Sequence, residues 1–341
     1  MNNYVAPFLA GAAMACSLVS PVRADPVADF YKDHPVIMVL GYSAGGGFDL
    51  YARDLAKYIG KYIPGHPNVV VQNMPGAGSV VAANYIYNVA PKDGSVISLV
   101  RAPVMDPVTG TTSSAFDATK YTWLGNGMTE FTVCAQLNNP QVKTLADAQK
   151  YPFTMASLGP GSDEDMFTKI LNNLFGLKDK IVSGYSGSAE AVLAIERGEV
   201  DGRCGWSWSS IRITKPEWVK DERFHVLTAL SLERSPDLPD IPSVMEFAQT
   251  DRQKQILRLL ISSEALGRPF LAPPGIPADR AAALRDAFAK TMEDPEFVAD
   301  RHAVNEVVNP EGWQQVDTLV KQLNATPKDL VQETKAIIGA N

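Results

Sequence analysis

Four short segments rich in glycine and serine are the part of this sequence best suited to bind a ligand. The first is Ser43–Gly47, with three consecutive glycines, between the apolar run Val36–Leu40 and a helical pattern that opens at Asp49. Glycine lets the main chain approach a ligand closely, and the first N–H groups of a helix have no partner inside the helix. Those donors and the positive helix end favour a carboxylate or a phosphate. The segment therefore predicts an anion-binding turn without specifying the anion.

Three further turns of the same kind follow later in the chain. Gly76–Ser79 follows a second strand-like run, and Ser157–Ser162 and Tyr185–Ser188 take the same places in the second half of the sequence. In open α/β sheets, ligands bind outside the carboxyl ends of the strands. We expect the four turns to face one cleft and to offer many backbone donors and few titratable groups. That combination is typical of a binding site rather than a reaction centre.

The turns do not carry the common nucleotide motifs. A dinucleotide site needs G-x-G-x-x-G and an acidic residue near the end of the second strand, where this chain has Gln72 and Asn73. None of the turns contains the G-K-[ST] of a Walker loop. We therefore expect no cofactor.

Two catalytic interpretations are weaker than binding. The run from Gly184 to Ser188 resembles a nucleophile elbow with its last glycine displaced, so an exported serine hydrolase using Ser186 and an acidic partner is an alternative. No histidine stands in a supporting motif. The carboxylates of Asp163–Asp165 are a second candidate, for acid–base chemistry. Negative charge in the first turn of a helix is ordinary capping, and we favour that interpretation. The chain is expected not to be an enzyme.

The cysteines and histidines do not form a metal motif. The sequence has no C-x-x-C and no metal-ligand spacing, and its histidines are scattered.

Cys134 and Cys204 both lie in strand-like runs. An oxidising compartment would let them pair, and two buried free thiols are the slightly favoured alternative. The sequence leaves their redox state open.

The N-terminus has the pattern of an export signal. Val5–Val19 is apolar and rich in small residues, and Val22-Arg23-Ala24 is an A-x-A-like cleavage site. We expect a signal peptide over residues 1–24, cleaved after Ala24, and a periplasmic mature protein. A membrane anchor is the alternative, but a run of about 15 residues is short for a span of roughly 20. Lipid attachment at Cys16 is a further possibility, against which the alanine at the leucine-preferred position argues.

Composition describes an ordinary globular protein. The chain has 341 residues, enough for two domains, with 45% hydrophobic and 20% charged residues. Its net charge of −7 argues against nucleic acid as a partner, because nucleic acids require a basic face.

Hydrophobic periodicity predicts two α/β units, each with alternating strands and helices. The first unit has strands at 36–40, 68–72 and 95–100 and helices at 49–62 and 80–89. After an extended run at 121–137 and a helix at 143–150, the second has strands at 153–157, 180–183, 200–204 and 224–230 and helices at 163–175 and 189–197. A Pro-rich segment at 268–277 precedes C-terminal helices at 279–292, 295–302, 313–323 and 328–338, expected to pack on the first unit.

An ordered set of motifs resembles one protein family. Ser43-Ala44-Gly45-Gly46-Gly47-Phe48-Asp49 and Asn73-Met74-Pro75-Gly76-Ala77-Gly78-Ser79 are similar to the paired motifs of tripartite tricarboxylate transporter receptors, the Bug or TctC-like periplasmic binding proteins. Ala90–Gly94, Tyr185–Ser188, Gly198–Asp201, Leu238–Ser243, Leu271–Pro277 and Met292–Glu296 match in the same order. The resemblance covers almost all of the mature chain.

This resemblance implies a two-lobed type II periplasmic-binding-protein fold, each lobe a doubly wound sheet flanked by helices. Lobe 1 would comprise residues 25–128 plus 251–341 and lobe 2 residues 129–250, with the ligand cleft between them. It also implies a monomeric receptor that captures a small organic carboxylate for the permease subunits of a tripartite tricarboxylate-type transporter. A receptor that feeds a signalling partner is an alternative.

The implied ligand-binding residues come from the four turns and two neighbouring charged positions. They are Ser43, Ala44, Gly45, Gly46, Gly47, Asp49, Gly76, Ala77, Gly78, Ser79, Arg101, Ser157, Gly159, Gly161, Ser162, Asp163, Tyr185, Gly187 and Ser188. Asp163 stands where relatives carry neutral residues, and Arg101 stands where they often have a small hydroxyl residue. An acidic group near the pocket opposes a dianion unless Arg101 offsets it. Trp206 and Trp208 suggest either an aromatic ligand wall or core packing.

Overall fold

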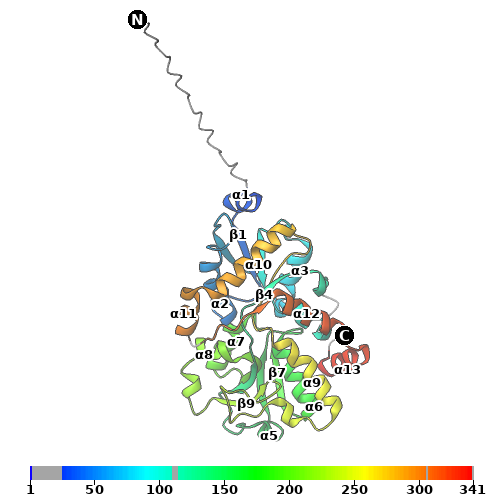
Figure 1. Cartoon of the computed structure of the whole chain (residues 1–341). Coiled ribbons are helices and arrows are strands. Elements are labelled where there is room, and N and C mark those ends of the chain that lie inside the picture. Colours follow the sequence, from blue (N-terminus) through cyan, green and yellow to red (C-terminus); the bar gives the residue numbers. More distant parts are fainter. Residues whose placement is uncertain (2–24, 110–113, 305, 340–341) are drawn as a thin grey trace.

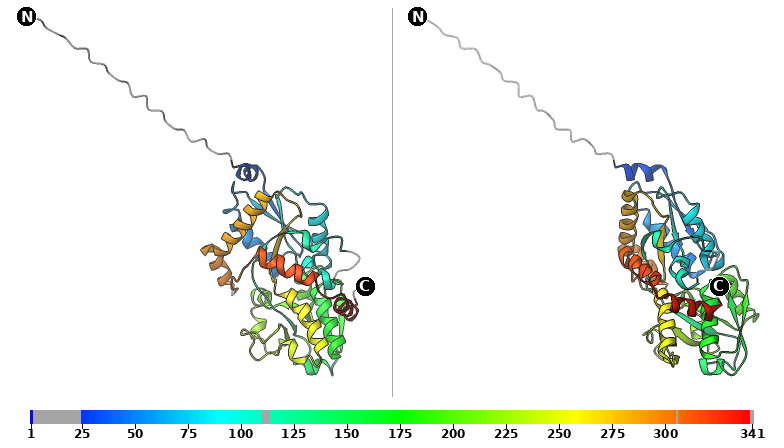
Figure 2. Two further views of the ribbon diagram at one scale, coloured as in Figure 1. Left: turned by 45° about the vertical axis from the view of Figure 1, so that its right-hand side comes forward. Right: turned by 90° about the vertical axis from the view of Figure 1, so that its right-hand side faces the viewer.

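The computed structural model describes residue 1 and residues 25–109, 114–304 and 306–339, and it has two lobes (Figure 1). The predicted signal peptide, its cleavage site and Cys16 lie outside the described residues. Each lobe is built on a mixed sheet with helices on both faces, as the views in Figure 2 show. The expected α/β, two-lobed, type II periplasmic-binding-protein fold is confirmed.

The first sheet holds the strands that precede the first two glycine turns. Its order is β11-β4-β10-β3-β1-β2, in which β1 is parallel to β2 and β3 while β10 is antiparallel to β3 and β4. These strands are short and mostly apolar, as expected for a sheet covered on both faces. The bounds are β1 Val36–Leu40, β2 Val69–Asn73, β3 Val96–Leu99, β4 Thr122–Asn126, β10 Pro269–Ala272 and β11 Glu311–Gly312.

The second sheet repeats this plan. Its order is β7-β6-β8-β5-β9, with β6 parallel to β7 and β8 and with β5 antiparallel to β8 and β9. In the first sheet β1, and in the second sheet β6, lies next to an edge strand and is followed by a glycine turn and a helix, so the turns of the two lobes emerge at comparable places. The bounds are β5 Thr132–Gln136, β6 Phe153–Ser157, β7 Asp179–Ser183, β8 Gly202–Ser207 and β9 His225–Leu230.

Helices cover the sheets and bury an apolar core on each face. In the first lobe α2, α10 and α11 pack on one side, around Leu55, Leu284 and Phe297. The helices are α1 Pro26–Asp33, α2 Gly47–Ile59, α3 Val80–Asn88, α4 Ala102–Thr109, α5 Leu145–Ala148, α6 Asp163–Phe175, α7 Ser188–Glu196, α8 Trp208–Thr214, α9 Asp251–Glu264, α10 Ala278–Glu293, α11 Pro295–Ala303, α12 Trp313–Asn324 and α13 Lys328–Ile338. Short 3₁₀ turns lie at Ala77–Ser79, Ala118–Lys120, Trp218–Lys220 and Val244–Phe247.

Several elements differ from the sequence-based expectation. The extended run at 121–137 is two strands in different sheets, β4 and β5, because the chain crosses between the lobes within it. The Pro-rich segment contains β10, which lies between β3 and β4, where Pro269 begins the strand. Helices α1, α4 and α8 were not predicted. Helix α2 begins at Gly47 rather than Asp49, which places one of the glycines inside its first turn.

The C-terminal helices do not all pack on the first lobe. Helix α13 contacts α6 as well as α4, and the side-chain amide of Asn173 donates to the carbonyl of Ile337 at 2.5 Å. Helix α9 lies beside α6 in Figure 1. Sheet membership of the strands agrees with the proposed lobes, whereas α9 and α13 reach across them; the residue limits of the lobes stay a proposal.

Cys134 and Cys204 form a disulfide, so the favoured interpretation of two free thiols was wrong. The cysteines lie on the neighbouring antiparallel strands β5 and β8. Sequence alone does not say which strands are neighbours, since the two residues are 70 positions apart.

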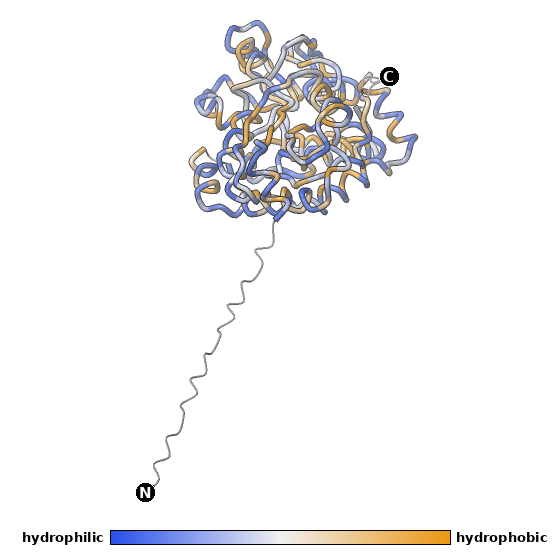
Figure 3. Tube along the Cα trace, turned by 90° about the horizontal axis from the view of Figure 1, so that it is seen from above, coloured by the Kyte–Doolittle hydropathy of each residue, from blue (hydrophilic) through white to orange (hydrophobic). Residues whose placement is uncertain are grey.

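Hydrophilic segments lie mainly at the periphery of the chain trace (Figure 3). Among the described residues, no helix combines the length and the apolar character needed to cross a membrane.

Candidate functional site

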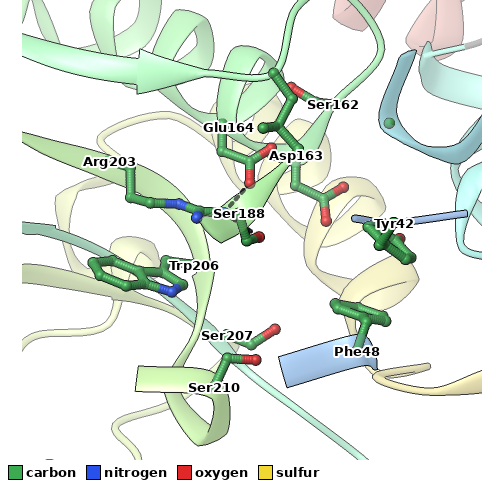
Figure 4. A pocket seen from close by; sticks show the side chains of 13 residues that line it. Tyr42, Phe48, Ser162, Asp163, Glu164, Ser188, Arg203, Trp206, Ser207 and Ser210 are labelled. Atoms are coloured by element: carbon green, nitrogen blue, oxygen red, sulfur yellow. Dashed lines mark hydrogen bonds and ion pairs between the residues drawn. The ribbon is translucent and has the colours of Figure 1, made fainter. Parts of the chain in front are cut away.

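A small pocket lies between the two lobes (Figure 4). The first lobe contributes Tyr42, Phe48 and Gly78. The space left free between the lining side chains is about 20 Å³, room for one or two waters, so the lobes are closed on each other. The residues that line it from the second lobe are Leu158, Ser162, Asp163, Glu164, Ser188, Arg203, Gly205, Trp206, Ser207 and Ser210.

Glycine permits the lobes to approach this closely. Gly78 has φ +57°, and a Cβ on it would lie 2.6 Å from the carbonyl oxygen of Gly161 on the other lobe. A Cβ on Gly47 would lie 2.7 Å from the Cβ of Ser210, again across the cleft. Neither position can carry a side chain without moving the lobes apart. The predicted turns therefore meet each other across the closed cleft.

Helix α6 delivers two carboxylates to the pocket. Ser162 is its N-cap and accepts a hydrogen bond from the Asp165 N–H at 3.2 Å, which fixes the start of the helix. Asp163 and Glu164 follow in the first turn. Gly205 on β8, at φ +61°, lets this turn approach, since a Cβ there would lie 2.7 Å from the carbonyl carbon of Asp163. The acidic first turn thus caps the helix and lines the pocket.

Arg203 is the cation of the pocket on the second lobe. It extends from β8, forms an ion pair with Glu164 through Nη2, and is 2% exposed (Figure 4). Its guanidinium carbon lies 5.0 Å from the ring centre of Trp206, a cation–π distance. Burial raises the pKa of the Glu164 carboxyl despite the opposing effect of Arg203. The Nε and Nη1 atoms of Arg203 are buried and have no hydrogen-bond partner among the described residues.

Arg101 connects the lobes behind the pocket. Its Nη1 donates to Asp163 at 2.5 Å and its Nη2 to Glu264 at 2.6 Å. Burial alone would lower the pKa of Arg101, but Asp163 and then Glu264 raise it above the ordinary value. Burial raises the pKa of the Glu264 carboxyl to about 7, although Arg101 opposes this. One guanidinium is therefore shared between two carboxylates.

An aromatic wall faces this charged side. The rings of Tyr42 and Phe48 stack at 4.1 Å, and the guanidinium of Arg268 lies 4.1 Å from the Phe48 ring centre. Arg268 also donates to the hydroxyls of Ser209 and Ser210 on the other lobe, at 3.2 and 3.3 Å. The aromatic wall thus belongs to the first lobe, and Arg268 links it to the second lobe through hydrogen bonds.

The structure divides the predicted site residues into four groups. Gly78, Ser162, Asp163 and Ser188 line the pocket. Gly45, Gly46 and Gly47 line an adjoining groove that shares Ser188, Trp206 and Ser210 with it. Ala44, Gly76, Ala77, Gly159, Gly161, Tyr185 and Gly187 lie in the surrounding turns without lining the pocket. The remaining five, Ser43, Asp49, Ser79, Arg101 and Ser157, make contacts that organise the turns.

Asp49 shows how the fourth group, the residues that organise the turns, works. Its carboxylate accepts from the Gly45 N–H at 2.9 Å and from Arg53 and Asn73. Burial acts to raise the pKa of Asp49. The hydrogen bonds, of which the one from Arg53 has the largest effect, outweigh burial, so the pKa is lowered. Ser79 likewise accepts from the N–H groups of Arg101 and Ala102 through its hydroxyl. These side chains hold the turns in shape rather than face the pocket.

Sequence reasoning missed most of the side chains on the pocket wall. Arg203 carried a detectable signal, since a charged residue in a strand buried along its length needs a partner. Of the two suggested tryptophans, Trp206 lines the pocket and Trp208 is buried without lining it. Leu158 lies inside the predicted turn at 157–162, and Glu164 was considered only for acid–base chemistry. The other lining residues, Tyr42, Phe48, Gly205, Ser207 and Ser210, were not singled out as site residues.

In the part of the chain that the structure describes, neither the serine hydrolase alternative nor metal binding finds support. Ser186 is exposed, does not line the pocket and has no hydrogen bond to a histidine there. Within those ranges, no group of three or more His, Cys, Asp or Glu side chains is placed to hold a metal ion.

Comparison with known proteins places the chain in a family. Residues 51–336 match the model of the tripartite tricarboxylate transporter family receptor, so the chain belongs to that family. A relative from Cupriavidus necator, called UPF0065 protein in gbd 5'region, is 26% identical over 307 residues, which are 87% of this chain and 86% of the relative. One from Pseudomonas sp. (strain P51), in the tcbD-tcbE intergenic region, is 26% identical over 70% of each chain.

Solved structures with the same fold come from periplasmic binding proteins. BugD has a TM-score of 0.70 at 20% identity, covering 91% of this chain and 99% of BugD. MatC from Rhodopseudomonas palustris, solved with bound malate, has a TM-score of 0.68 at 18% identity, covering 90% and 99%. An R. palustris protein solved with adipate has a TM-score of 0.70 at 17% identity, covering 90% and 98%. At these identities the likeness establishes the fold of solute-binding proteins.

Proposed function

We propose that this protein is a periplasmic receptor that captures a small organic carboxylate between its lobes and delivers it to the membrane subunits of a tripartite tricarboxylate-type transporter. The observation that carries this proposal is the closed interlobe pocket, which combines the N-terminal turns of α6 and α7 with the buried cation Arg203. Helix N-termini and a guanidinium are both suited to a carboxylate. Membership of the receptor family and neighbours solved with malate and adipate support the same ligand class.

Binding would proceed by closure of the lobes. In an open form the turns at 43–47 and 76–79 would separate from those at 157–162 and 185–188, exposing the pocket to a ligand. Closure then removes water from the ligand and strengthens its hydrogen bonds, because a protein interior has a lower dielectric constant than water. The receptor would bind and release its ligand without making or breaking covalent bonds. The permease subunits would recognise the closed form.

Isothermal titration of the mature chain with mono-, di- and tricarboxylates tests the receptor function. We expect at least one acid to bind and to raise the melting temperature, because a ligand that binds only the native state stabilises it. If no aliphatic, aromatic or amino acid binds, the receptor proposal fails.

Delivery to a permease needs a separate test. Uptake of the identified ligand by cells should require both this receptor and the transporter's membrane subunits. Uptake that persists without the receptor, or capture of a sensor kinase domain in place of the permease, would contradict the transporter proposal and favour a signalling role.

A further inference from the structure

Arg203 offers the pocket more hydrogen-bonding capacity than the protein uses. The side chain is 2% exposed, and within the described part of the chain only its Nη2 has hydrogen-bond partners, which are Glu164 and, at 3.4 Å, the hydroxyl of Ser188. Its Nε and Nη1 are buried and unpartnered. A buried donor without a partner costs free energy, and guanidinium donors bind a carboxylate in a forked geometry. Arg203 is therefore placed to receive one carboxylate of a ligand.

Asp163 gives the opposite side of the pocket a negative charge. Figure 4 shows its carboxylate reaching into the same space from the start of α6. Its side chain is 19% exposed, against 6% for Glu164 and 1% for Glu264, so it is the carboxylate of the three that is most open to a ligand. Arg101 offsets this charge only in part, because it also binds Glu264. A second ligand carboxylate beside Asp163 would be repelled, whereas an ammonium group would be attracted.

The adjoining groove gives room for a side chain. It has a volume of about 340 Å³ and joins the pocket at Ser188, Trp206 and Ser210. Ala189, Val192 and Leu193 of α7 supply apolar surface along it, with the Lys215–Glu196 ion pair at its rim. An apolar substituent leaving the pocket along Trp206 would be buried there.

From these three features we infer that the ligand is a zwitterionic amino acid with an apolar side chain. Its carboxylate binds Arg203, its ammonium group binds Asp163, and its side chain lies in the groove along Trp206. This inference rests on the proposed receptor function and narrows its ligand class. Asp163 and Arg203 are then the residues that decide which ligands bind.

The test uses matched ligands in calorimetric titrations of the mature chain. L-Leucine and L-phenylalanine are compared with their des-amino acids, 4-methylpentanoate and 3-phenylpropanoate, with the corresponding amines, and with succinate, malate and adipate. We expect an amino acid to bind about tenfold or more tightly than its des-amino acid and than its amine. The des-amino acid lacks the ammonium group that would bind Asp163, and the amine lacks the carboxylate that would bind Arg203. If a dicarboxylate binds and the amino acids do not, the inference fails while the receptor function stands. If none of these or other acids binds, the receptor function itself fails.

Two substitutions test where the ammonium group and the carboxylate of the ligand bind. Asp163→Asn should remove most of the preference for the amino acid over its des-amino partner, and Arg203→Gln should weaken both at least tenfold. Asp165→Asn is the matched control, because Asp165 lies in the same helical turn, pairs with Lys169 at 2.8 Å and does not line the pocket. Urea unfolding of each variant confirms that it is folded. An unchanged preference in a folded Asp163→Asn protein would overturn the placement of the ammonium group.

Discussion

Arg101 and Asp163 form an ion pair at 2.5 Å that joins the two lobes. Arg101 follows β3 of the first sheet in the chain, and Asp163 is the first residue of α6, the helix that follows β6 of the second sheet. The guanidinium is 3% exposed, and its other end binds Glu264. The pair thus links the two lobes in the closed form, beside the pocket that Asp163 lines.

Removing the cation should destabilise the protein more than removing one of its partners. Arg101→Met leaves the carboxylates of Glu264 and Asp163 buried without their guanidinium, and we expect a loss of about 3–5 kcal/mol in the free energy of unfolding. The double variant with Glu264→Gln should recover part of that loss. Urea denaturation measures both, and a loss below about 1 kcal/mol in Arg101→Met would contradict the structural role.

Glu264 should make stability depend on pH. Burial raises its pKa to about 7 in the folded protein, against 4.5 for the ordinary group. Between these values the folded state holds a proton that the unfolded state has released, so stability falls as pH rises from about 4.5 to 7 and levels off above. The stability of Glu264→Gln relative to wild type should therefore increase over this range.

Asp179 contributes a pH dependence of the same sign and is the control for this measurement. Burial raises its pKa to about 7, so Glu264→Gln should reduce the slope without abolishing it. Chemical denaturation at pH 5, 6, 7 and 8 gives the slopes. A stability difference between Glu264→Gln and wild type that does not change with pH would argue against an elevated pKa at Glu264.

Two neighbouring glycines should respond differently to alanine. Gly47→Ala places a methyl group against Ser210 of the other lobe, whereas a Cβ on Gly46 would lie 3.5 Å from the Cβ of Ser188, an ordinary contact. We expect Gly47→Ala to weaken ligand binding at least tenfold by opposing closure, and Gly46→Ala to bind within about threefold of wild type. Small-angle scattering should show the Gly47 variant more open. Equal effects of the two substitutions would refute this account of closure.

The disulfide should stabilise the second lobe. Cys134 and Cys204 close a loop of 70 residues, for which loss of the cross-link costs about 2–4 kcal/mol. The double Cys→Ser variant, or wild type in reductant, should melt at lower temperature than oxidised wild type. Thiol labelling of the denatured oxidised protein checks the bond itself: complete labelling of both cysteines would show that they are free.

Much of the fold and part of the site could be predicted because they depend on short stretches of sequence. An apolar run, a glycine turn and a helical period are contiguous, and this gave β1, β6, α6 and the positions of the four turns. Ordered motifs then indicated the family and the two-lobed fold. Ser162, Asp163, Ser188 and Gly78, which line the pocket, were found in this way.

Other features depend on which distant segments become neighbours. Pro269–Ala272 is a strand only because β3 and β4 flank it, and the cysteines pair only because β5 and β8 are adjacent. Arg203 faces the pocket because Gly205 admits the first turn of α6 beside its strand.

The sequence by itself indicated the receptor family, the two-lobed fold and the glycine turns at strand ends. Tertiary structure decided which charges those turns enclose, because an ion pair such as Arg101–Asp163, 62 positions apart, exists only once two lobes meet.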